Sequence, residues 1–584
     1  MHIAPTPSKR LFTAFASGII LCLLLAHTAQ AASPSFSVTG ADEQQQANIS
    51  AWLSKLNENC ELSPIQERNL LKKSRENTQQ ALQALGYYHA DIDLHINYNK
   101  NCWQLQVAVI ANDPVIIEEI DVQLIGEAQF DKAFKAMINA SNIKLGDVLQ
   151  HQHYEKLRNS LLSLSSDRGY FSALLEKQEL RVDVKNNRAS IHLHLNSGPR
   201  FYFGDVEFEQ ESLRDAFLQK FVPFKAGDPF DNHQLLSLRQ DLAGSGYFSD
   251  VRIHTLKDQA DDLQVPIRVS SNDKPRYVYT AGIGFATDTG PRVRFGVENR
   301  RVNSRGHRYK TGLEFSPVRS VAGINYEVPV RNPSKERFNY SSNYTHEDID
   351  NKLSKRLRFG IAYLRELRSG WLSSYSLNWE REDYTVASQS DITYLLMPGF
   401  ELTRIKADDA VYPRLGWKLN GSIRGAHEDV ASSVSFVQFH GIAKGIFPTW
   451  YGRILMRIEG GASLADELIE LPSSVRFFSG GDSTIRGYAY QSLGPKNAQG
   501  DVIGARHLLA ASVEYEFPLT QRWYMAVFTD GGNAYDKLKD FEPVYGVGAG
   551  IRWRSPIGPI RLDIAHPTEG SSNFRIHISM GLDL

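Results

Sequence analysis

The sequence predicts a multidomain chain in which three small α+β domains precede a 16-stranded antiparallel transmembrane β-barrel. Three observations lead to this prediction: an N-terminal export signal, a repeat of about 80 residues, and alternation of apolar and polar residues from about residue 275 onward. Membrane strands of this alternating kind leave the mean hydropathy of a chain low. The mean hydropathy of −0.34 fits that class, and the net charge of −1 indicates no global field that would attract nucleic acid.

The first 31 residues have the order of a secretory signal peptide. Lys9 and Arg10 provide a short positive region, an apolar run follows, and Ala29 and Ala31 occupy the two positions that a signal peptidase reads. The alternative is a membrane anchor, but a spanning helix needs roughly 20 apolar residues, more than this run supplies. We therefore expect cleavage after Ala31.

Two cysteines remain in the mature chain, because Cys22 leaves with the signal peptide. In an exported protein, an even pair with no other thiol predicts a disulfide between Cys60 and Cys102. The alternative is two separate buried thiols. Two cysteines are too few for a structural zinc site, so no metal is predicted there.

A short aromatic motif recurs three times in the first half of the chain. It begins at Gly86, Gly169 and Gly246, which are 83 and 77 residues apart. A near-constant period of this length indicates copies of one small domain rather than a short-repeat solenoid. Each glycine follows a helix-like stretch, where a left-handed conformation would end the helix. Each unit is therefore predicted to contain one strand, two helices and two further strands.

These repeats resemble POTRA domains, the periplasmic modules of outer-membrane assembly and secretion proteins. The expected ranges are 32–112, 113–197 and 198–273 for the three copies, and 274–584 for the barrel. The first copy is the most divergent, and it contains the two cysteines. The resemblance implies that each module is a small sheet covered by a pair of helices.

The second half divides into sixteen alternating segments of roughly 19 residues each, which suits membrane strands of about 10 residues plus connections. An even number of strands closes the sheet without leaving free edges in hydrocarbon. The last strand is expected to alternate from Phe574 through Leu584. A soluble all-β sandwich is the alternative, but the strands are too many, too regular and too aromatic on one face for that class.

The longest predicted external connection, residues 464–505, is the sixth external loop and contains Ile485-Arg486-Gly487-Tyr488. This tetrad is similar to the V-R-G-F/Y motif of the BamA-like family, which combines POTRA domains with a barrel. In that family the loop folds back into the barrel, and its arginine meets an acidic residue of the inner wall. A guanidinium in a constricted lumen needs a planar anionic partner. The alternative is an ordinary exposed loop arginine.

The resemblance also implies a partner for Arg486. Asp530 lies in a segment that resembles the family's F-x-D-x-G motif and is the first candidate; Glu514 is the second. Either acid could instead be a solvated charge of the lumen.

The first and last barrel strands are expected to meet at a lateral seam. Glycines weaken strand packing there, and a short pairing would let the seam open and accept a client strand by β-augmentation. The residues assigned to this seam are Tyr277, Gly282, Gly284, Phe574, Ile578 and Gly581.

Three POTRA copies and sixteen strands make the mature chain similar to the TamA branch of this family, the outer-membrane subunits of the translocation and assembly module. The resemblance implies a factor of the cell outer membrane that inserts proteins of the autotransporter type, with its POTRA domains in the periplasm. The partners it implies are a TamB-like periplasm-spanning protein at the first POTRA domain, unfolded outer-membrane protein clients and outer-membrane lipid. A two-partner secretion pore for one dedicated exported protein is the alternative, and a passive porin is a more distant one.

No motif in the sequence predicts an enzyme or a cofactor. The glycine-rich segment 546–550 lacks the following helix that a dinucleotide-binding loop requires. Two His-x-His pairs are expected on solvated faces rather than as metal ligands: His151 with His153, and His192 with His194.

Overall fold

The computed structural model describes residues 33–584, apart from 57–58, 100–101, 351, 557 and 571–572. The predicted signal peptide and its cleavage site lie outside the described residues. The chain forms two compact units, one built on the first two repeats and one that joins most of the third repeat to the barrel. In the described part of the chain, no helix has the length and apolarity needed to cross a membrane.

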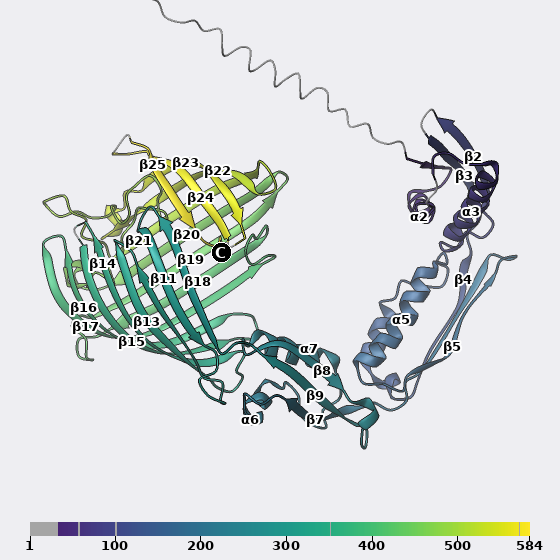
Figure 1. Cartoon of the computed structure of the whole chain (residues 1–584), viewed down its shortest axis with the longest axis horizontal. Helices are drawn as coiled ribbons and strands as arrows, with labels where there is room; N and C mark the ends of the chain where they lie inside the picture. The colour runs from purple at the N-terminus through teal and green to yellow at the C-terminus, as the bar shows by residue number, and fades with distance from the viewer. Residues whose placement is uncertain (1–32, 57–58, 100–101, 351, 557, 571–572) are drawn as a thin grey trace, which may run out of the picture. The chain divides into compact units, whose positions relative to one another are not determined.

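The first repeat is a three-stranded sheet with the order β1-β3-β2 and two helices (Figure 1). Both helices begin with a capping box, in which Asp42 and Ser63 each accept a hydrogen bond from the third helical N–H. Cys60 and Cys102 form a disulfide, with their Cα atoms 4.6 Å apart. The elements are β1 (Ser35–Thr39), α2 (Glu43–Leu53), α3 (Pro64–Gln83), β2 (Asp91–Asn99) and β3 (Cys102–Ile110).

The second and third repeats have the same plan, with sheet orders β4-β6-β5 and β7-β9-β8. The second contains β4 (Ile116–Ile125), η1 (Glu127–Phe130), α4 (Lys132–Asn139), α5 (His151–Asp167), β5 (Leu174–Asp183) and β6 (Arg188–Asn196). The third contains β7 (Tyr202–Glu209), α6 (Asp215–Leu218), η2 (Gln219–Phe221), α7 (Asn232–Gly244), β8 (Phe248–Thr255), η3 (Lys257–Gln259) and β9 (Gln264–Asp273).

The recurring glycine has the predicted backbone conformation in all three repeats. Gly86, Gly169 and Gly246 follow α3, α5 and α7 with φ values of 95°, 83° and 85°. This left-handed region is where glycine ends a helix without a steric penalty. The sequence motif therefore marks the same structural position in each repeat.

The expectation that His192 and His194 lie on a solvated face is wrong for His192, which is buried. Both imidazoles converge on Asp121 of the neighbouring strand β4, at 3.4 Å from His192 Nδ1 and 2.6 Å from His194 Nε2. The parallel pairing of β4 with β6 places Asp121 opposite His192. Hydrogen bonds from His194 and Gln123 lower the pKa of Asp121 to about 2. The histidines are therefore held by a carboxylate that only the strand register brings to them.

The barrel contains sixteen consecutive antiparallel strands, β10 to β25, which confirms the predicted number. The alternation is also confirmed: in β15, Phe359 and Ile361 are exposed, whereas Arg358 donates a 2.6 Å hydrogen bond to the buried Glu380. The strands are β10 (Tyr277–Ala286), β11 (Gly290–Asn299), β12 (Arg308–Phe315), β13 (Arg319–Pro329), β14 (Glu336–Ile349), β15 (Lys352–Glu366), β16 (Leu372–Val386), β17 (Gln389–Ala407), β18 (Gly416–Ala426), β19 (Phe436–Thr449), β20 (Gly452–Leu464), β21 (His507–Pro518), β22 (Trp523–Tyr535), β23 (Val544–Ser555), β24 (Gly558–Pro567) and β25 (Arg575–Met580).

The third repeat is attached to the turn between β11 and β12. Tyr247 donates a hydrogen bond of 2.5 Å to the carbonyl oxygen of Gly306. The ring of Phe217 lies so close that a Cβ atom at Gly306 would be 2.2 Å from it. Gly306 also has a φ of 75°. A residue with a side chain would therefore disrupt this junction.

The last strand is shorter than predicted. β25 ends at Met580, although the N–H of Gly581 still donates to the carbonyl of Pro559, and Leu582 is exposed while Asp583 is buried. The Asp583 side chain is buried, with Arg453 Nη2 at 2.8 Å and Arg561 as a second partner. Lys444 Nζ donates a 3.0 Å hydrogen bond to the Asp583 carbonyl. A buried carboxylate requires cationic partners, and these partners hold the chain end against the inner wall.

Candidate functional site: loop 6 and the lateral seam

The connection between β20 and β21, residues 465–506, is here called loop 6, and it folds against the inner wall of the barrel. It contains the short helix η4 (Leu468–Glu470). Ile485 is fully buried and Arg486 is 8% exposed. Gly487 has a φ of 101°, and a Cβ there would lie 3.0 Å from the backbone nitrogen of Pro567. A glycine at this position permits both the reversal and the close approach to the wall.

Arg486 contacts both acids that the sequence singled out. Its Nε and Nη2 atoms donate to the two carboxylate oxygens of Asp530, at 2.8 and 2.9 Å, and its backbone N–H donates to Asp530 at 3.0 Å. Nη1 donates to Glu514 at 2.7 Å. The guanidinium also lies over the ring of Phe528, with 3.4 Å to the ring centre. This bidentate, charge-assisted arrangement is the geometry for which arginine is suited.

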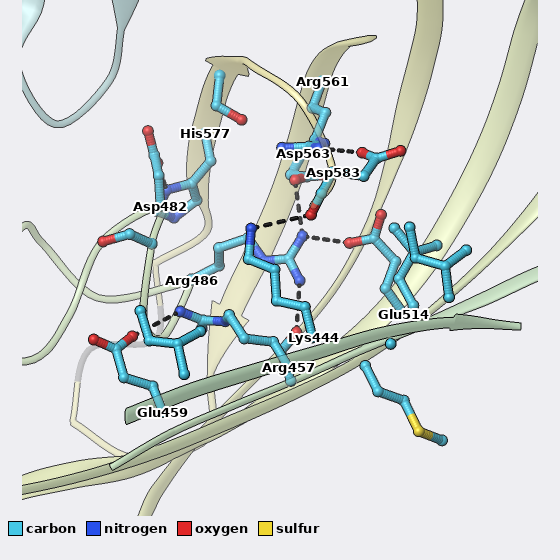
Figure 2. Close-up of a pocket in the computed structure, with 18 residues that line it drawn as sticks. Lys444, Arg457, Glu459, Asp482, Arg486, Glu514, Arg561, Asp563, His577 and Asp583 are labelled. Carbon is cyan, nitrogen blue, oxygen red and sulfur yellow. Dashed lines mark hydrogen bonds and ion pairs between the residues drawn. The ribbon is translucent and has the colours of Figure 1, made fainter. Parts of the chain in front are cut away.

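Two further charged residues belong to the site, and the sequence did not point to them individually. Asp563 of β24 accepts from Arg486 Nη1 at 3.1 Å, and Arg552 of β23 donates to both Asp563 and Glu514, at 2.5 and 2.9 Å. Arg486 and Arg552 thus share the buried carboxylates of Glu514 and Asp563, whereas the buried Asp530 pairs with Arg486. Figure 2 shows Arg486 directed toward Glu514 and Asp563. Both residues lie in the hairpin formed by β23 and β24.

The rest of the tetrad also lies on the wall. The hydroxyl of Tyr488 donates to the carbonyl oxygens of Tyr545 and Glu569, at 3.4 and 3.3 Å. A cavity of about 490 Å³ opens beside Arg486. Charged side chains of both signs line it, including Lys444, Arg457, Glu459 and Asp583 (Figure 2). Apolar side chains, including Ile442 and Leu455, complete the lining.

The seam between the first and last strands is short. Among the described residues, one backbone hydrogen bond joins the end of the first strand to β25, from the N–H of Thr287, which directly follows β10, to the carbonyl of Ile578 at 3.2 Å. The N–H of Ile578 donates in turn to the Thr287 hydroxyl at 2.7 Å. β10 is otherwise paired along its length with β11 alone. Ile283, which is 87% exposed, marks this unpaired edge.

The predicted seam residues are therefore only partly brought together. Ile578 makes the contact, and its partner is Thr287, which the sequence did not indicate. Tyr277, Gly282 and Gly284 lie on β10, outside that hydrogen-bonded contact. Phe574 and Gly581 flank β25 rather than belonging to it.

Three side chains near the seam approach closely enough to suggest a metal site: Asp288, Asp482 and His577 offer atoms within 4.8 Å of one another. His577 does not fit that role. Its Nε2 accepts a 2.9 Å hydrogen bond from the N–H of Gly487, so the ring proton resides on Nδ1, which lies 2.5 Å from Asp482 Oδ1. Neither nitrogen offers a free lone pair to a cation, and the three residues form a hydrogen-bonded group instead.

Three protein-family models match the chain. Residues 35–111 match the model described as POTRA domain TamA domain 1, and residues 201–272 match the POTRA model described as Surface antigen variable number repeat. Residues 302–583 match the Omp85 superfamily domain.

Two curated relatives are similar in sequence. Outer membrane protein assembly factor BamA of Nitratidesulfovibrio vulgaris is 24% identical over 395 residues, which cover 62% of this chain and 48% of that protein. The BamA of Neisseria meningitidis serogroup B is 19% identical over 623 residues, which cover 89% of this chain and 72% of that protein. This chain thus spans about half the length of the first relative and nearly three quarters of the second.

A solved structure shows the same fold. BamA from Haemophilus ducreyi lacking POTRA domains 1–3 aligns with a TM-score of 0.66 at 16% identity, and the alignment covers 80% of this chain and 98% of that one. The sixteen-stranded barrel, the buried arginine of loop 6 and the matched domains agree with one another. Residues 302–583 are therefore a β-barrel of the Omp85 superfamily, and they follow POTRA domains at residues 35–111 and 201–272.

Proposed function

We propose that this protein inserts or assembles other proteins into the outer membrane by parting its first and last strands to accept a client strand. The observation that carries the proposal is the seam, where one backbone hydrogen bond joins the end of the first strand to β25 among the described residues. Two relatives carry the name outer membrane protein assembly factor. Assembly of outer-membrane proteins is therefore the first function to test for this chain.

The edge of β10 provides a physical reason for binding a strand. An N–H or C=O group left unpaired in hydrocarbon costs several kcal/mol. A client strand laid along β10 would satisfy those groups by β-augmentation. Its alternating side chains would continue the outward apolar face that Ile283 and Tyr279 begin. The recognition would thus depend on the backbone and on alternation, which suits many different β-barrel clients.

The finer proposal concerns clients and partner. The clients would be unfolded outer-membrane proteins of the autotransporter type, delivered in the periplasm, where the POTRA domains would lie. A TamB-like protein anchored in the inner membrane would dock on the first POTRA domain. The match of residues 35–111 to a TamA-type first POTRA domain supports this partner. Outer-membrane lipid would surround the barrel, and the mechanism needs no catalytic group.

Locking the seam tests the central proposal. A Thr287→Cys/Ile578→Cys pair, oxidised to a disulfide, should abolish assembly of an autotransporter barrel in proteoliposomes, and reduction should restore it. A matched control, Leu419→Cys/Ala443→Cys, joins two strands that are already paired in register and should leave assembly unchanged. The unmodified protein treated with the same reductant controls for loss of the Cys60–Cys102 disulfide. Full assembly by the locked seam would disprove the proposal.

The partner is tested separately with the full-length protein in its own envelope. A photoreactive residue at Ile65, which is 69% exposed on the first POTRA domain, should capture a very large inner-membrane-anchored protein. Capture of a single exported adhesin-like protein instead would favour a two-partner secretion pore.

A further inference from the structure

Loop 6 touches both sides of the seam. On the side of the first strand, the N–H of Asp482 donates a 2.8 Å hydrogen bond to Asp288, in the turn between β10 and β11. On the side of the last strand, the Asp482 carboxylate lies 2.5 Å from Nδ1 of His577 in β25. The N–H of Gly487 donates to the other nitrogen of the same imidazole. One loop segment, residues 482–487, therefore links the two strands that form the seam.

The fit of this segment is close. Gly481 has a φ of 99°, and a Cβ at that position would lie 2.6 Å from a carboxylate oxygen of Asp288. The His577 side chain is 4% exposed and the Asp482 side chain is 13% exposed. These contacts are made inside the barrel, where hydrogen bonds compete less with water. Figure 2 shows Asp482 and His577 directed toward each other.

The links through loop 6 outnumber the direct links. Among the described residues, Thr287 and Ile578 supply the two hydrogen bonds between the seam strands. Loop 6 supplies three more, through Asp288 on one side and His577 on the other. Two of the three involve a carboxylate, and charge-assisted hydrogen bonds are stronger than neutral ones. Closure of the seam at this end thus depends more on the loop than on strand pairing.

Loop 6 is itself anchored to the inner wall of the barrel. Arg486, between the two seam contacts in sequence, is held by Asp530, Glu514 and Asp563 on β22, β21 and β24. Through the loop, the seam strands are thereby connected to a rigid part of the wall. By linkage, anything that releases this loop segment favours an open seam, and an open seam favours release of the segment.

We propose that Asp288, Asp482 and His577 are positioning residues through which loop 6 holds the seam closed, so that the seam opens when residues 482–487 withdraw. This inference rests on the proposed function, because it assigns the control of the same seam. The inference does not depend on which client or partner the protein binds. The width of the seam in the isolated protein is therefore the quantity to measure.

The test places spin labels on each side of the seam in the full-length protein reconstituted in nanodiscs. Ile283→Cys and Ile576→Cys put the labels on exposed, outward-facing positions that do not touch loop 6. Pulsed electron–electron distance measurements should give one narrow distribution. In His577→Ala, a large fraction of the molecules should shift to longer label-to-label distances. His577→Gln, whose amide can both accept and donate a hydrogen bond, should restore the narrow distribution.

The matched control is His440→Ala. His440 is another lumenal histidine, and it stacks on Phe477 of the same loop but lies on β19, away from the seam. An unchanged distance in His577→Ala would overturn the inference, and so would an equal widening in His440→Ala. Widening that is specific to His577→Ala supports it. If the widened variant then assembles clients at the normal rate, the proposed function is contradicted while the control of seam width by loop 6 stands.

Discussion

The wall that anchors loop 6 and the seam beside it belong to one sheet but are held by very different forces. At the wall, β21 to β24 form continuous ladders, and Arg486 and Arg552 together contact three buried carboxylates, two of which they share. At the seam, one backbone hydrogen bond and one threonine hydroxyl join the strands among the described residues. A hydrogen bond to a charged group contributes about 1.5–3 kcal/mol, and a neutral one about 1. The comparison indicates a rigid anchor next to the place where the sheet parts most easily.

The largest effect is expected from breaking the wall. Arg486→Ala would remove the bidentate partner of Asp530 and would leave Glu514 and Asp563 with Arg552. Loss of one partner of a buried ion pair typically costs about 3–5 kcal/mol. We expect a lower unfolding temperature, measured by heat-modified mobility on gels, together with a marked loss of client assembly.

Arg414→Ala, in an exposed turn, is the control for Arg486→Ala and should change neither quantity. If Arg486→Ala kept the normal unfolding temperature, the wall would not be the anchor described here.

A smaller effect is expected where loop 6 meets the first hairpin. Gly481→Ala combines a left-handed backbone with a Cβ placed 2.6 Å from Asp288. The left-handed conformation alone costs a residue with a side chain about 1–2 kcal/mol. The control is Gly500→Ala in the same loop. Gly500 also has a left-handed φ, of 91°, but a Cβ added there would meet open space. The seam distance should widen in Gly481→Ala and stay normal in Gly500→Ala; equal widening would assign the effect to backbone strain alone.

The direct seam contact should contribute less than the loop. Thr287→Ala removes the hydroxyl that accepts from the N–H of Ile578. The loss of one such hydrogen bond is worth about 1 kcal/mol. The same distance measurement should show a modest widening, smaller than in His577→Ala.

Thr289→Ala, two residues away, is the matched control for Thr287→Ala, because its hydroxyl has no hydrogen-bond partner among the described residues. A widening in Thr287→Ala greater than in His577→Ala would reverse the order proposed for strand and loop.

The smallest effect is expected from pH. Burial, together with the nearby Asp482 carboxylate, raises the pKa of Asp288 from 3.8 to about 6, against the opposing charges of His577 and Arg575. Because this pKa lies above its ordinary value, the contribution of Asp288 to the closed state is full below about pH 4 and is lost as the pH rises through about 6. The seam should therefore widen slightly between those limits.

Asp288→Asn should remove this pH dependence. A widening that persisted in Asp288→Asn would contradict its assignment to Asp288.

Much of the architecture follows from local patterns. Alternation with a period of two identifies the barrel strands because it depends only on which face each residue occupies. The glycines at 86, 169 and 246 mark helix ends because their backbone conformation is a local property. The pairing of Arg486 with Asp530 was anticipated from a family resemblance, since alternation alone cannot rank one lumenal acid above another.

The sequence by itself determined the repeat, the strands, the pair of cysteines and the arginine that enters the lumen. Only the tertiary structure decided which charges meet that arginine and how the seam is held. Asp563 lies 77 residues from Arg486, and Asp288 lies 194 residues from Asp482. Such partners are set by closure of the whole barrel. The same reason applies to the chain end: alternation places Asp583 on the inner face, but only the closed barrel brings Arg453 and Arg561 to its buried carboxylate.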